Sequence, residues 1–112
     1  MKRFVVALAG IAFLSGGSLF AQDAKKIADG KKLYDQKECA KCHMINGKGN
    51  KIGKLDGVGT KLPEADIRKW FTNTVEMEAK LDHKPKVKMS SKKVNLSPAE
   101  IDALTAYMMS LK

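Results

Sequence analysis

The residues best suited to chemistry are two cysteines and a histidine that lie within five positions, Cys39, Cys42 and His43. Their spacing, C-x-x-C-H, is the signature of c-type haem attachment. Two intervening residues let one helical turn place both sulfurs along one edge of a porphyrin, where each thiol adds to a vinyl group as a thioether. His43 comes next, as the proximal ligand of the iron. The motif therefore predicts one covalently attached haem c per chain.

Three other interpretations use the same residues. An exported protein could join Cys39 and Cys42 in a disulfide. A thioredoxin-like redox pair has the same C-x-x-C spacing, but it belongs to a βαβ setting, and no stretch of this chain alternates as a strand does. A zinc site needs four ligands, but the chain offers only Cys39, Cys42, His43 and at most His83. Haem attachment is favoured because the motif takes up both cysteines and one of the two histidines.

The first 21 residues have the order of a secretory signal. Lys2 and Arg3 precede an apolar run over residues 4–14, and Leu19-Phe20-Ala21 offers a small residue at a cleavage site. The alternative is an uncleaved anchor, but a membrane span needs about 20 apolar residues. We therefore expect a signal peptide over residues 1–21, a single domain over residues 22–112, and a periplasmic protein without a stable membrane span.

Composition narrows the function classes. A chain of 112 residues makes a multi-domain enzyme improbable, and two cysteines are too few for a disulfide-dense scaffold. Without residues 1–21 the chain has 19 basic and 12 acidic residues, a charge of +7. This excess suits an acidic protein partner, an anionic membrane surface or nucleic acid. Nucleic acid is the weakest of the three, because only 6% of residues are aromatic and the signal exports the chain.

Three segments are predicted to be helical and must position the motif. The first covers residues 23–37 and the second residues 63–75, which Pro63 can open. The third begins at Ser97, which with Glu100 forms a capping box. The apolar positions of each segment recur at helical spacing: Ile27, Gly30 and Tyr34; Ile67, Trp70, Phe71, Thr74 and Val75; Ile101, Leu104, Tyr107, Met108 and Leu111. Residues 44–61 and 81–95 are predicted to be irregular.

With these residues the sequence resembles the class I c-type cytochromes, specifically the small bacterial periplasmic ones with one haem. The resemblance covers nearly all of residues 24–112. Gly30 and Tyr34 look like the family's N-terminal helix contact, and Leu104 and Tyr107 look like its partner positions on the last helix. The resemblance implies an all-α cytochrome c fold, in which three main helices and irregular loops wrap one covalently attached haem.

The resemblance also implies a distal ligand. The family's usual ligand is a methionine in an irregular segment before the last helix, and Met89 matches that position. Relatives usually carry a proline next to this methionine, whereas here Pro85 comes four residues earlier. His83 and Met77 are the alternatives, with bis-histidine ligation in the case of His83.

Two further residues take roles from the resemblance. Many relatives have Gly-Pro before the loop beneath the proximal histidine, and the proline carbonyl accepts the second imidazole N–H. Here the pair is Gly53-Lys54, so the carbonyl of Lys54 is expected to accept from His43. Trp70 either packs near a haem propionate, where its indole N–H would satisfy an oxygen, or is a plain apolar residue of its helix.

Taken together, these expectations describe an electron carrier rather than an enzyme. An iron with both axial positions filled has no open site for a substrate and can pass one electron with little rearrangement. Clustered lysines would steer the carrier, as a monomer, to an acidic redox-protein donor and acceptor. The alternatives are a haem peroxidase or gas-binding protein in which Met89 dissociates, and a haem-free thiol oxidoreductase.

Overall fold

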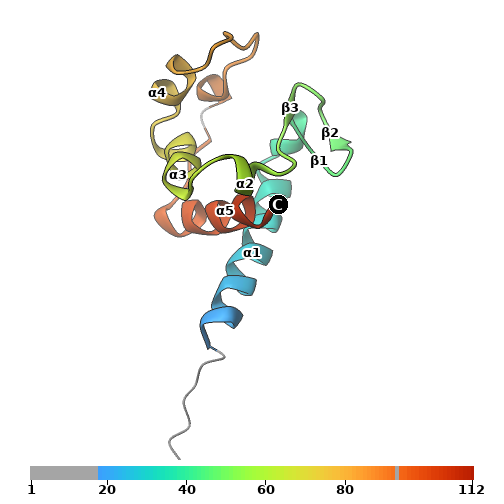
Figure 1. Cartoon of the computed structure of the whole chain (residues 1–112), viewed down its shortest axis with the longest axis vertical. Coiled ribbons are helices and arrows are strands. Elements are labelled where there is room, and N and C mark those ends of the chain that lie inside the picture. Colours follow the sequence, from blue (N-terminus) through green and yellow to red (C-terminus); the bar gives the residue numbers. More distant parts are fainter. Residues whose placement is uncertain (1–17, 93) are drawn as a thin grey trace, which may run out of the picture.

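The computed structural model describes residues 18–92 and 94–112, so most of the predicted signal segment lies outside the described residues. Within this part of the chain the fold is mainly helical. The helices are α1 (Ser18–Gln36), α2 (Val58–Lys61), α3 (Glu64–Thr72), α4 (Thr74–Ala79) and α5 (Pro98–Ser110), with two short 3-10 turns, η1 (Cys39–Lys41) and η2 (Met89–Lys92). Figure 1 shows α5 lying across α1, with the remaining elements on one side of this pair.

The crossing of α1 and α5 confirms the predicted helix contact. At Gly30, an added Cβ would lie 2.1 Å from the carbonyl oxygen of Ala103 and 2.6 Å from the Cβ of Tyr107, so only glycine permits this approach. One turn later, the rings of Tyr34 and Tyr107 meet edge to face with centroids 5.8 Å apart. The helix begins at Ser18, five residues earlier than predicted, and ends one residue earlier, at Gln36.

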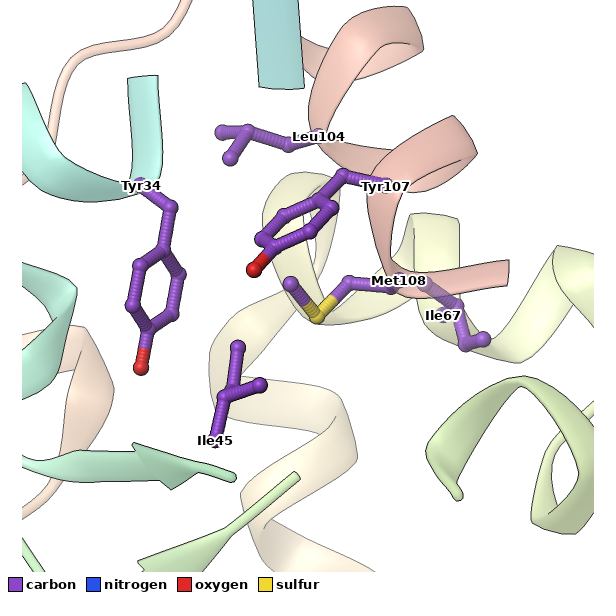
Figure 2. Close-up of a cluster of buried hydrophobic side chains, with 6 residues drawn as sticks. All are labelled: Tyr34, Ile45, Ile67, Leu104, Tyr107 and Met108. Carbon is purple, nitrogen blue, oxygen red and sulfur yellow. The ribbon is translucent and has the colours of Figure 1, made fainter. Parts of the chain in front are cut away.

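The core lies where α1, α5, α3 and the first strand meet. Figure 2 shows its buried side chains, which are Tyr34, Ile45, Ile67, Leu104, Tyr107 and Met108. The hydroxyl of Tyr34 is buried and has no hydrogen-bond partner in the described residues. Burial, assisted by the neighbouring Cys39 thiol, raises the pKa of Tyr34 to about 12. The core therefore reaches the C-x-x-C-H motif.

The second helix was predicted as one continuous element over residues 63–75, and this prediction is wrong. The chain breaks at Asn73, which has φ −131° and ψ 52°, so that α3 ends and α4 begins there. Because the break turns α4 away from the axis of α3, the predicted apolar stripe does not continue. Ile67 is buried, but Val75 is 70% exposed.

A small sheet replaces part of the irregular stretch predicted over residues 44–61. The strand β1 (His43–Ile45) pairs antiparallel with β2 (Lys48–Gly49) and parallel with β3 (Gly53–Lys54). Strands of two or three residues carry no detectable alternation, which is why the sequence did not indicate them. The register places His43 opposite Gly53.

The last helix follows its prediction closely. The Ser97 hydroxyl accepts from the Glu100 N–H, and the Glu100 carboxylate accepts from the Ser97 N–H, which completes the capping box. These bonds hold the pKa of Glu100 below its ordinary value. No helix in the described part of the chain is long and apolar enough to cross a membrane.

Candidate functional site

The two cysteines lie on one short turn between α1 and the sheet. Glu38, in the left-handed region with φ 58°, reverses the chain after α1 and lets η1 begin at Cys39. The N–H of Cys42 donates to the carbonyl of Cys39 at 3.1 Å, which closes the turn. Both thiols are half-buried and free of any disulfide. The backbone therefore presents the two sulfurs from a single turn, as the spacing predicts.

The ring of His43 is fixed by a main-chain carbonyl on the neighbouring strand. Its Nδ1–H donates to the carbonyl oxygen of Gly53 at 3.1 Å. The acceptor is therefore Gly53 rather than Lys54, because the parallel register sets Gly53 opposite His43. Burial lowers the pKa of His43, and the Gly53 bond partly opposes this. A neutral imidazole held at Nδ1 has Nε2 available for a metal, the usual arrangement of metal-bound histidines.

Gly53 and Gly49 leave room for this loop. A Cβ on Gly53 would lie 2.6 Å from the His43 Nδ1, and a Cβ on Gly49 would lie 2.0 Å from the His43 carbonyl oxygen. Asn50 ties the loop to the motif, because its N–H donates to the carbonyl of His43 and its Nδ2 donates to that of Lys41. The sequence analysis gave no role to Asn50. Its position among five glycines was the available signal.

Met89 and Trp70 meet at a cavity. It has a volume of about 680 Å³, in the range of small-molecule and cofactor sites. Its lining includes Trp70 and Phe71 from α3, Val75 from α4, and Met89 at the start of η2. Trp70 is half-buried and lies outside the core cluster, whereas Ile67 and Phe71 of the same helix pack on that cluster. Cys39, Cys42 and His43 are not among the lining residues. The five predicted site residues therefore form two groups in the described structure: Cys39, Cys42 and His43 at the turn, and Trp70 and Met89 at the cavity.

The elements that carry the two groups lie on opposite sides of the fold. Figure 1 shows the sheet on one side of the view and α4 with η2 on the other, both above α5. Residues from one side could reach one face of a flat cofactor, and residues from the other side its opposite face. The His43 ring held at Nδ1, the paired thiols and the cavity at Met89 fit a haem.

The rival ligands occupy other environments. Met77, in α4, is 8% exposed and is not among the residues that line the cavity. His83 lies on the exposed stretch between α4 and η2. Met89 is intermediate in exposure and remains the methionine at the cavity.

The sequence analysis missed a carboxylate that holds the Met89 turn. Glu78, in the last turn of α4, accepts from the Ser90 N–H at 2.7 Å and from the Ser90 hydroxyl at 2.8 Å. The Ser90 backbone bond is the main cause that lowers the pKa of Glu78. The two residues are 12 positions apart in an irregular region, so no periodic signal connects them.

Two alternative uses of the cysteines lose support. Reactive C-x-x-C thiols have a lowered pKa, whereas burial raises the pKa of Cys39. In residues 18–92 and 94–112, no three His, Cys, Asp or Glu side chains gather as a metal-binding group, so the zinc interpretation has no ligand set there.

A mainly helical fold around a C-x-x-C-H turn defines a c-type cytochrome. The sequence model of the Cytochrome c family matches residues 27–112, and the chain belongs to this family. The protein is therefore a haem-binding electron carrier whose cofactor is covalently attached haem c with its iron. Comparison with curated proteins and with solved structures found no match.

Proposed function

We propose that this protein is a periplasmic class I cytochrome with one haem, which shuttles single electrons between two redox proteins. In this proposal Cys39 and Cys42 form the two thioethers. His43 and Met89 are the axial ligands, and Trp70 packs beside the haem. When bound, the haem iron supplies the reversible one-electron couple, and the protein supplies ligation, burial and a docking surface.

The hydrogen bond from His43 to Gly53 carries the proposal. It fixes the tautomer with Nδ1 protonated and leaves the basic nitrogen, Nε2, free to bind a metal. The histidine lies at the start of β1, directly after the turn that presents both thiols. A half-buried histidine that only packs would also need a hydrogen-bond partner, but it would have no need of the neighbouring pair of thiols.

The distal side supports methionine rather than histidine ligation. Met89 lies at the cavity, and its turn is tied to α4, whereas His83 is exposed. A thioether favours the ferrous state and raises the reduction potential relative to two histidines. Trp70 lines the same cavity, where its indole N–H could donate to a haem propionate.

Filled axial positions argue for a carrier rather than an enzyme. A peroxidase needs an open distal site with a general acid or base close to it. Arg68 is the arginine nearest in sequence to Trp70, and it is engaged by Asp102 of α5 at 2.6 Å. His83, the second histidine of the chain, is exposed.

The surface supports an acidic partner. Lysines are exposed on both sides of the fold, and they include Lys41, Lys48, Lys51, Lys54, Lys84, Lys86, Lys88 and Lys92. Exposed apolar residues, Ile52 and Val87, lie among them. A positive surface steers an acidic protein into a short-lived complex, as a shuttle requires. Cleavage after Ala21 would release residues 22–112 with a charge of +7.

Mass spectrometry of protein exported by a host that matures c-type cytochromes tests the attachment. We expect one added haem per chain and a haem-bearing peptide that contains both Cys39 and Cys42. The variants Cys39→Ala and Cys42→Ala should each lose at least one thioether. An exported protein with no added mass and two titratable thiols would contradict the proposal and favour a thiol protein.

A further inference from the structure

The turn that carries Met89 is anchored by one carboxylate. The two oxygens of Glu78 accept from two different groups of Ser90, its N–H at 2.7 Å and its hydroxyl at 2.8 Å. Ser90 directly follows Met89, so this two-point contact fixes the backbone next to Met89, the proposed ligand of the iron. Hydrogen bonds to a carboxylate are shorter and stronger than those between neutral groups.

The neighbouring residues offer little other support. In the described part of residues 81–92, the other hydrogen bonds of η2 are local, with the N–H and hydroxyl of Ser91 donating to the carbonyl of Lys88. Residues 81–84 and 86–88 are exposed. The Glu78 contact is therefore the hydrogen-bonded link in this region between η2 and a helix of the domain.

The residue after Met89 makes this link possible. A proline in place of Ser90 would have no N–H to donate. Ser90 supplies both an N–H and a hydroxyl, and Glu78 lies where both can reach it.

We propose that Glu78 is a positioning residue for the axial ligand, and that it acts by holding Ser90 so that Met89 stays in its binding conformation. The inference rests on the proposed role of Met89. It concerns how firmly the ligand is held, because Glu78 acts through Ser90 and does not itself bind the iron.

Competition by an external ligand measures how firmly Met89 is held. Imidazole is titrated into the oxidised holoprotein, and its apparent affinity increases as the Met89 conformation becomes less populated. We expect Glu78→Ala, which removes both acceptors, to raise that affinity roughly tenfold. Glu78→Gln keeps one carbonyl oxygen as an acceptor and should give a smaller increase. Glu78→Gln also tests the proposal if Glu78→Ala fails to mature.

Two further variants separate the contact between Glu78 and Ser90 from general effects. Asp82→Ala also removes one negative charge, from an exposed residue between α4 and η2. It should leave the affinity for imidazole within about twofold of the wild type. Ser90→Pro removes both donors, so adding Glu78→Ala to it should change the affinity little, as a double-mutant cycle requires for a direct pair.

The outcomes distinguish this inference from the proposed ligation. If Met89→Ala retains the Fe–S absorption band at the red edge of the visible spectrum, the ligation itself is wrong. If that variant loses the band while Glu78→Ala binds imidazole as the wild type does, only the positioning role is overturned. An effect of Glu78→Ala that persists unchanged in the Ser90→Pro background would also overturn it.

Discussion

The crossing of α1 and α5 at Gly30 gives a stability prediction that can be worked out from the structure. In Gly30→Ala the new Cβ would lie 2.1 Å from the Ala103 carbonyl oxygen, whereas ordinary contacts begin at 3.4 Å. The opposing atom belongs to the backbone of a helix and cannot rotate away. The two helices must therefore separate by roughly 1 Å, and a close-packed interior does not yield easily to such a shift.

The expected magnitude follows from three contributions. Overpacking of a well-packed contact costs about 3 kcal/mol at the upper end of its range. Separation of the Tyr34 and Tyr107 rings, now 5.8 Å apart, loses about 1 kcal/mol more. The better helix propensity of alanine returns about 1 kcal/mol. We expect a net loss of about 3 kcal/mol and a decrease in Tm of about 15 °C for a domain of this size.

Thermal unfolding of the holoprotein, followed by circular dichroism in the far ultraviolet, measures this loss. Ala28→Leu is the matched control, because Ala28 is exposed on the same helix and a larger side chain there should change stability by no more than about 0.5 kcal/mol. If Gly30→Ala melts at or above the wild-type Tm, the better helix propensity of alanine outweighs the cost of overpacking. The close approach of the helices is then refuted.

Three further predictions concern the ligand, acid and salt. Gly53→Ala should raise the reduction potential measured by spectroelectrochemistry, because a displaced His43 loses its Nδ1 bond and becomes a weaker donor to ferric iron; an unchanged potential would contradict this. Glu100→Gln should be less stable than the wild type above the unfolded pKa of about 4.3, and the two should converge as the pH falls through the lowered pKa of Glu100 in the folded state. If denaturant unfolding shows that the free energies of unfolding of Glu100→Gln and the wild type still differ in acid, that result would count against this interpretation. Electron-transfer rates with an acidic redox protein, measured by stopped flow, should fall as ionic strength rises from about 0.01 to 0.15 M, and a flat profile would remove the steering argument.

The parts of the fold that were predicted correctly are those with local signals. The cap of α5 depends on Ser97 and Glu100, three residues apart, and its apolar face recurs at helical spacing. The contact of Gly30 with α5 was predicted from the resemblance, because Gly30 and Tyr34, four residues apart, match the family's N-terminal helix contact. The motif of Cys39 to His43 is likewise contiguous in sequence.

The parts that were missed depend on contacts between distant residues or on one backbone angle. The break at Asn73 is a single conformation inside an otherwise helical pattern. The acceptor for His43 was expected to be Lys54, and only the strand register shows it to be Gly53. The link from Glu78 to Ser90 joins two segments whose separation in space no spacing rule determines.

The central claim is that one haem is held by His43 on one face and Met89 on the other, and the absorption spectrum of the oxidised holoprotein tests it most directly. The red-edge band of Fe–S ligation is compared in the wild type, Met89→Ala and His83→Ala. We predict that the wild type and His83→Ala show the band and that Met89→Ala lacks it. A wild-type protein without the band, or a band that survives in Met89→Ala, would contradict the account.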